Sequence, residues 1–172
     1  ILNPDLDVLA PTRVWGLTRA DCVQLAADWD IPIEATAEKI YSIDENMWGR
    51  AIECGVLENP WSAPPAEPFT LTRDPADAPS EPKSIVIGFE RGVPMTLDGE
   101  TVGLVDLIGR VGELVGSYGW GRIDMVENRR VGIKSREVYE CPASLALILA
   151  HRDLEGITLE RDLARDRKST RL

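Results

Sequence analysis

The chain has 172 residues, of which 44% are hydrophobic and 28% are charged, which is the composition of a globular protein with a sizeable core. Its net charge is −10, and the excess lies within residues 1–82, which hold 5 Lys and Arg against 15 Asp and Glu. An acidic chain without a basic face argues against a nucleic-acid partner, and no apolar run approaches the roughly 18 residues of a membrane span.

The cysteines and the chain ends carry further expectations. The three cysteines, Cys22, Cys54 and Cys141, are widely scattered, and with one histidine in the chain no zinc-site spacing is available. Free thiols are typical of a reducing compartment, and no charged-then-apolar leader opens the chain, so we expect a cytoplasmic protein. The chain begins at Ile1 without a methionine and ends in a charged run, which predicts a piece of a longer protein.

The first part of the chain predicts a strand followed by a helix. DVLAPTRVW at 7–15 mixes β-forming residues with a proline, which predicts a short strand with a turn after it. Thr18 is expected to cap the helix, with Asp21 placed as in a capping box. An apolar face follows at helical spacing: Cys22, Leu25, Ala26 and Trp29. Pro32 ends the helix, and such a strand–helix pair suits the edge of an α/β layer.

The next part is ambiguous. In YSIDENMWGRAIECGVLENPW at 41–61, Ser42 followed by Glu45 has the form of a capping box, which predicts a short helical turn. A surface turn anchored by Trp48 is the alternative. Residues 59–82 contain seven prolines, which exclude a central strand or helix there. We expect this loop to wrap the domain rather than to act as a lid.

A β-meander and a helix follow. KSIVIGF at 83–89 predicts a strand, a turn leads to a return strand at 93–97, and Asp98-Gly99 predicts a second hairpin turn. Residues 103–116 predict a helix with one apolar face. SYGWG at 117–121 is a glycine-rich link that is too short for a phosphate-binding loop.

The stretch GRIDMVENRRVGIKSREVYE at 121–140 holds the greatest variety of polar groups. Two β-rich runs joined around Asn128-Arg129-Arg130 bring acids, bases and a phenol from both strands into one small area. Carboxylates bind ammonium groups, and hydroxyl and guanidinium groups bind carboxylates, so this area suits a ligand that carries both groups. A solvated sheet face held by cross-strand pairs is the alternative.

Two helices are expected to follow. Pro142 suits a first helical position, and residues 143–151 are apolar nearly all round, which predicts a buried helix. His151, at the polar end of that helix, is interpreted as a capping or surface residue rather than a catalyst. Thr158 is expected to start the second helix. The predicted fold is α+β: an antiparallel sheet of hairpins and a meander packed with helices, preceded by a strand–helix remnant of an α/β nucleotide-binding domain.

The two motifs at 41–61 and 121–140, in this order, resemble signatures of the argininosuccinate synthases. The resemblance extends from about Leu6 to the end of the chain and includes FERGVP at 89–94 and AHRDLEGITLERD at 150–162. It implies two domains. These are the tail of a nucleotide-binding domain at 1–36, with a boundary near 35–38, and a synthetase domain at 37–172 that is truncated at its carboxy end.

The resemblance also implies a function. The family is ATP-dependent: it adenylates the ureido oxygen of citrulline, the amine of aspartate then displaces AMP, and magnesium accompanies the ATP. The phosphate loop of the family, and most of its aspartate-binding residues, have no counterpart in this chain. We therefore expect this chain to bind no cofactor and to be inactive alone. The family is usually a homo-tetramer built with a carboxy-terminal helix that this chain lacks. A non-catalytic amino-acid-binding or assembly module is the alternative.

Three residues match citrulline-binding positions of the resembled family: Ser42 in YSIDEN, Glu127 in VENR and Tyr139 in REVYE. A carboxylate at Glu127 accepts from an α-ammonium group, and the two hydroxyls either donate to an α-carboxylate or accept from the ammonium. The family often has a second serine nine residues beyond the first, where this chain has Ala51. The missing hydroxyl is expected to weaken binding by the roughly 0.5–1.5 kcal/mol of one net hydrogen bond if the side chain makes the contact. If backbone or water makes the contact, nothing is lost. No catalytic or metal-binding residue is assigned.

Overall fold

The chain divides into two compact units, Ile1–Ile40 and Tyr41–Leu172. The computed structural model describes residues 6–33 of the first unit and 41–169 of the second. The domain boundary expected near 35–38 lies outside the described residues. Within these ranges, no helix combines the length and the apolar character that a membrane crossing requires.

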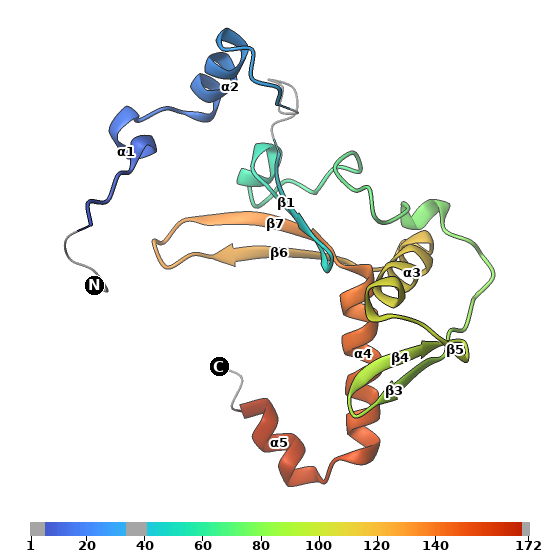
Figure 1. Ribbon diagram of the computed structural model, residues 1–172. Helices are drawn as coiled ribbons and strands as arrows, with labels where there is room; N and C mark the ends of the chain where they lie inside the picture. The colour runs from blue at the N-terminus through green and yellow to red at the C-terminus, as the bar shows by residue number, and fades with distance from the viewer. Residues whose placement is uncertain (1–5, 34–40, 170–172) are drawn as a thin grey trace. The chain divides into compact units, whose positions relative to one another are not determined.

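The described part of the first unit consists of two short helices, α1 (Pro11–Trp15) and α2 (Arg19–Asp28) (Figure 1). The strand expected at 7–15 is therefore wrong. Pro11 occupies the first turn of α1, where its fixed φ and missing N–H suit a helix. The capping box of α2 is confirmed: the Thr18 hydroxyl accepts from the Asp21 N–H at 3.2 Å, and the Asp21 carboxylate accepts from the Thr18 N–H at 2.8 Å. The hydroxyl and the N–H of Thr18 lower the pKa of Asp21.

The second unit contains a four-stranded antiparallel sheet with the strand order β1-β2-β7-β6. Its strands are β1 (Ser42–Asn46), β2 (Gly49–Glu53), β6 (Arg122–Asn128) and β7 (Lys134–Glu140). The hairpin expected within 121–140 is confirmed as β6–β7. Because β2 pairs with β7 at the centre of the sheet, the motifs at 41–61 and 121–140 lie side by side.

The helical turn expected at Ser42 is wrong, because this segment is the β1–β2 hairpin. The side chain of Asn46 accepts from the Trp48 N–H at 2.8 Å, which is a local Asx turn. The alternative of a surface turn at Trp48, which is 47% exposed, fits the hairpin. A 3-10 turn, η1 (Gly55–Glu58), follows β2.

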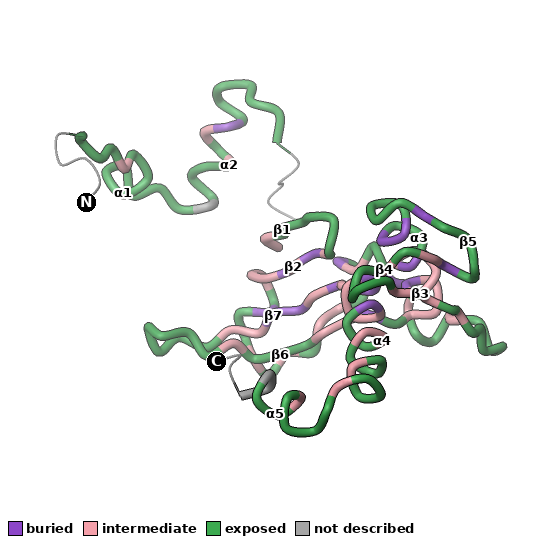
Figure 2. Tube along the Cα trace, turned by 60° about the horizontal axis from the view of Figure 1, so that its bottom comes forward, coloured by how far each residue is buried: buried purple, intermediate pink, exposed green. Residues whose placement is uncertain are grey.

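The predicted meander is confirmed as a second sheet of β3 (Ile87–Glu90), β4 (Val93–Leu97) and β5 (Glu100–Thr101), although β3 begins later than expected. The predicted helix is confirmed as α3 (Leu104–Ser117), which packs beside α4 (Pro142–Thr158) (Figure 1). Between the two helices and this sheet lies the larger core cluster: Leu97, Val102, Leu107, Ile108, Val111, Ala143 and Leu147. A smaller cluster joins Ile52, Leu57 and Val138, and Figure 2 shows buried residues along β2 and β7.

Helix α4 is longer and less buried than expected. It continues to Thr158, because nothing stronger than Gly156 interrupts it, so the helix expected to start at Thr158 begins instead as α5 (Arg161–Ser169). Ile148 is 61% exposed, so only one side of α4 is buried. His151 thus lies inside the helix, with Nδ1 3.3 Å from the Glu155 carboxylate, rather than at a helix end.

The proline-rich loop at 59–82 wraps the second unit as expected, with one 3-10 turn, η2 (Pro75–Asp77), as its regular structure. It runs close to the end of α3. A Cβ added at Gly116 would lie 2.2 Å from the Leu71 carbonyl oxygen, and the Arg73 N–H donates to the Gly116 carbonyl at 2.9 Å. The missing side chain of Gly116 therefore allows the loop to pack directly on the helix.

Candidate functional site

The strand register places all four sequence-predicted positions on one face of the four-stranded sheet. The cross-strand partners are Ala51 with Tyr139, Ser42 with Glu53, and Glu127 with Ser135. Side chains alternate between the two faces along a strand, so residues two apart share a face. We define the site face by these residues: Ser42, Ala51, Glu53, Glu127, Glu137 and Tyr139.

The four positions are not equally close. Ala51 and Tyr139 are direct partners on the two central strands. Ser42 and Glu127 lie on the two edge strands, β1 and β6, which are three strand spacings apart, or roughly 14 Å. Ser42 and Glu127 therefore lie at opposite edges of the site face, and Tyr139 lies on a strand between them.

Arg129, in the β6–β7 turn, links three carboxylates that come from three strands. Its Nε lies 2.7 Å from Glu127, and its Nη2 lies 3.0 Å from both Glu53 and Glu137. Hydrogen bonds to Glu127 and then to Glu137 raise the pKa of Arg129, so the guanidinium stays charged. Three carboxylates against one guanidinium leave this cluster with an excess of negative charge, which attracts cations.

Tyr139 is held by the same cluster. Its hydroxyl donates to Glu137 Oε2 at 2.5 Å, and this bond, together with burial, raises the pKa of Tyr139 to about 12. Burial alone would raise the pKa of Glu137, but hydrogen bonds from Tyr139 and Arg129 outweigh it and lower the pKa. Glu137 is therefore a carboxylate at neutral pH that accepts from both a phenol and a guanidinium.

Asp124 and Arg136 lie on the reverse face of the sheet, which is the face opposite the site face. Arg136 Nη2 lies 2.6 Å from the Asp124 carboxylate, and Arg136 Nη1 donates to the Ser62 carbonyl at 2.5 Å. Asp124 is three residues from Glu127 on the same strand, so the two carboxylates point to opposite faces. They cannot act as a paired acid and base on one ligand.

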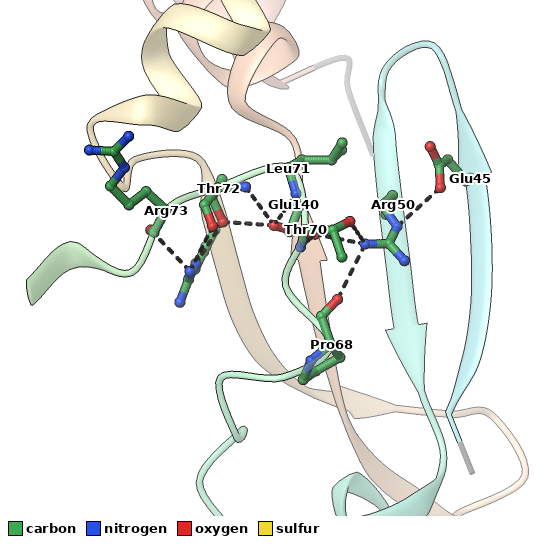
Figure 3. A network of polar contacts seen from close by, with 9 residues as sticks. Glu45, Arg50, Pro68, Thr70, Leu71, Thr72, Arg73 and Glu140 are labelled. Carbon is green, nitrogen blue, oxygen red and sulfur yellow. Dashed lines mark hydrogen bonds and ion pairs between the residues drawn. The ribbon is translucent and has the colours of Figure 1, made fainter. Parts of the chain in front are cut away.

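Glu140 is fully buried on the reverse face and fixes the proline-rich loop (Figure 3). Its Oε1 accepts from the N–H groups of Leu71 and Thr72 at 2.9 Å each and from the Thr72 hydroxyl at 2.7 Å. Its Oε2 accepts from the Thr70 N–H at 3.0 Å and from Arg50 Nη1 at 3.2 Å. One carboxylate thus meets five donors, four of which belong to the loop.

Arg50 and Arg122 are the cross-strand partners of Glu140 on its two sides, and both also contact the loop. Arg50 Nη1 donates to the Pro68 carbonyl at 3.2 Å and to the Thr70 hydroxyl (Figure 3). Arg50 Nε lies 3.1 Å from Glu45, an ion pair without hydrogen-bond alignment. Arg122, on the other side, donates to the Thr72 hydroxyl at 2.7 Å. The loop is therefore tied to three strands behind the site face.

Sequence reasoning missed Glu53, Glu137 and Arg129 as members of the site. The signal for Glu137 was present, because it stands two residues before Tyr139 in a strand and so shares its face. Glu53 likewise stands two residues after Ala51. Arg129 carried no such signal, since it lies in the turn, outside both strands.

The described residues form no cluster of metal ligands, and the glycine-rich link at 117–121 does not fit a nucleotide phosphate. Among them, no group of three or more His, Cys, Asp or Glu side chains is arranged to hold a metal. The glycine-rich link at 117–121 packs against other backbone: a Cβ at Gly119 would lie 2.9 Å from Pro75 Cα, and one at Gly121 2.4 Å from Pro142 Cα. A phosphate cradle needs open backbone N–H groups, so this link does not fit one.

Comparisons with known proteins identify the family. Residues 41–171 match the family model described as the arginosuccinate synthase C-terminal domain. The chain is 53% identical over 163 residues to the argininosuccinate synthase of Geobacillus kaustophilus, a match that covers 95% of this chain and 40% of the relative. It is 54% identical over 162 residues to that of Symbiobacterium thermophilum, with 94% of this chain and 40% of the relative covered. The chain therefore spans about 40% of the length of these curated relatives.

Proposed function

The chain belongs to the argininosuccinate synthase family, and on that premise we propose that it forms part of an ATP-dependent ligase. The reaction condenses citrulline with aspartate to give argininosuccinate, AMP and pyrophosphate. We assign residues 1–36 to the tail of a nucleotide-binding domain and 37–172 to the synthetase domain. Homo-tetrameric assembly and a cytoplasmic location belong to the same proposal.

The site face carries the proposal, because it brings Ser42, Glu127 and Tyr139 to one side of the sheet from motifs far apart in the chain. Its acidic cluster suits the ammonium group of an amino acid. Ser42, on the far edge strand, is suited to another polar group of the same citrulline molecule. The proposed role of this chain is to bind and orient citrulline.

Adenylation followed by attack of an amine depends mainly on positioning and on stabilisation of charge. The glycine-rich link at 117–121 does not fit ATP phosphates, and the proposal places ATP and magnesium on a part of the enzyme outside this chain. In this proposal, the residues of the site face hold the citrulline molecule. Its ureido oxygen then points away from the sheet, towards the nucleotide.

The test is a chimera in which this chain replaces the matched 163-residue segment of the Geobacillus kaustophilus protein. We expect the chimera to make argininosuccinate and the isolated chain to make none. Glu127→Gln and Tyr139→Phe should each raise the KM for citrulline by about tenfold, as expected for a lost charged hydrogen bond, with much smaller effects on the KM for aspartate. Glu100→Gln, in an exposed ion pair with Arg110, is the matched control.

Two results would contradict this proposal. Turnover by the isolated chain would show that it needs no further ATP-binding part. Micromolar binding of citrulline to the isolated chain in calorimetry, combined with an inactive chimera, would favour a non-catalytic amino-acid receptor.

A further inference from the structure

We infer that Glu137 is a positioning residue that makes Tyr139 a hydrogen-bond acceptor towards the ligand, so that this wall of the site binds the ammonium group of the substrate and not its carboxylate. The inference rests on the proposed function and adds to it the orientation of the amino-acid end of the substrate. Glu137 acts through Tyr139, whose hydroxyl it holds.

Tyr139 has one proton to donate. A phenol has a single O–H donor, whereas an ionised carboxylate can only accept. The Tyr139 hydroxyl donates to Glu137 Oε2 at 2.5 Å, so its proton is already committed. The Tyr139 oxygen can still accept a hydrogen bond through its lone pairs, and an ammonium group can donate that bond.

The opposite arrangement would cost Glu137 one of its hydrogen bonds. If Tyr139 donated to a ligand carboxylate, Glu137 would lose the donor at its Oε2. The side chain of Glu137 is only 10% exposed, so water would replace that donor poorly. A buried acceptor left without its partner costs more than an ordinary hydrogen bond gains. The existing bond from Tyr139 to Glu137 is therefore retained when the ligand binds.

The charges around Tyr139 also favour an ammonium group over a carboxylate. Glu53, Glu127 and Glu137 surround Arg129 within 3.0 Å, so negative charge exceeds positive charge at this point of the face. An approaching ammonium group is attracted by this excess, and an approaching carboxylate is repelled by it. The cation already bound, Arg129, is the kind of group that the cluster selects.

The experiment removes one charged group from the ligand at a time. The ligands are L-citrulline, 4-aminobutylurea, which keeps the ammonium and lacks the carboxylate, and 5-ureidopentanoic acid, which keeps the carboxylate and lacks the ammonium. Dissociation constants are measured by calorimetry for the chimera with the Geobacillus kaustophilus segment. The variants are Tyr139→Phe, Glu137→Gln and the control Glu100→Gln.

We expect Tyr139→Phe and Glu137→Gln each to raise the dissociation constants of citrulline and 4-aminobutylurea by about tenfold. Glutamine keeps the size of the side chain, but its amide carries donors and no longer fixes the Tyr139 proton. Binding of 5-ureidopentanoic acid should change less than about twofold. The control Glu100→Gln should leave the dissociation constants of all three ligands unchanged.

The opposite pattern, with the acid ligand weakened and the amine ligand unaffected, would overturn this inference while leaving the proposed function intact. A parent chimera that binds none of the three ligands would overturn the proposed function itself, and this inference with it.

A readout without ligand separates positioning from a loss of structure. Tyrosinate formation at Tyr139, followed by ultraviolet absorbance and assigned by difference from Tyr139→Phe, should occur at lower pH in Glu137→Gln than in the parent. The far-ultraviolet circular dichroism should stay unchanged. An unaltered Tyr139 titration in Glu137→Gln would contradict the proposed link between the two side chains.

Discussion

Arg50 and Glu140 lie opposite each other on β2 and β7, and their side chains meet at 3.2 Å inside the protein. Ninety residues separate them in the chain. The pair joins the two motifs and the proline-rich loop at one point, because Glu140 also accepts from the backbone of Thr70, Leu71 and Thr72.

Glu140→Gln is expected to destabilise the second unit by about 3 kcal/mol, the cost of breaking a buried ion pair from one side. Whichever oxygen the amide nitrogen replaces, that nitrogen would face at least two donors, since Oε2 meets two of them and Oε1 meets three. The free energy of unfolding in urea measures the effect. Glu45→Gln is the matched control, because Glu45 pairs with the same Arg50 but its side chain is 58% exposed. A loss below about 1 kcal/mol is expected there, and equal losses in both variants would contradict the role of burial.

Gly116→Ala is expected to destabilise the protein by about 2 kcal/mol, because the new Cβ would overlap the Leu71 carbonyl oxygen of the loop. Gly109→Ala in the same helix meets nothing within 4 Å and is expected to stabilise by about 0.5–1 kcal/mol through its higher helix propensity. Thermal melts of the two variants compare them directly. A higher melting temperature for Gly116→Ala would show that the loop does not pack on this part of α3.

Ala51→Ser adds a hydroxyl to the centre of the site face, beside Tyr139. If citrulline lies on this face, the new hydrogen bond should lower the KM for citrulline by about two- to tenfold in the chimera. Ala63→Ser, at an exposed position in the proline-rich loop, is the control. An unchanged KM in Ala51→Ser would argue against a ligand contact at this position.

The link between Tyr139 and Glu137 predicts a pH dependence of stability. The pKa of Tyr139 is raised from 10.0 to about 12 in the folded protein, so folding favours the protonated phenol. This contribution is fully present below pH 10 and is lost as the pH rises towards 12. Urea titrations at pH 9 and near pH 12 should show a smaller loss of stability in Tyr139→Phe than in the parent. An identical loss in both proteins would contradict the shift.

The sequence predicted the elements whose signals are local. The hairpin at 121–140, the meander and α3 follow from residue periodicity and turn residues, which act over a few positions. The helical turn at Ser42 was wrong because a capping-box pattern is also local, whereas β1 is stabilised by pairing with β2. The strand at 7–15 failed for a related reason: it has no partner strand in the described part of its unit, and Pro11 suits a helix start.

The site was predictable only in part. Ser42, Glu127 and Tyr139 came from the resemblance, and their common face follows once the register is known. Glu53 shares the face of Ala51 by its spacing, but it comes near Glu137 because β2 pairs with β7. Arg129 reaches the cluster because its long side chain turns back over the sheet. The burial of Glu140 depends on a loop about 70 residues away, for which no residue pattern near Glu140 gives a sign.

Tyr139 and Glu140 are neighbours in the chain, yet the first points to the ligand side of β7 and the second to the loop side. The odd-numbered positions of this strand therefore lie on the ligand side, while Arg136 and Glu140 hold the loop from the other side. A library aimed at altered amino-acid preference can vary Ser135, Glu137 and Tyr139 without touching the residues that fasten the loop.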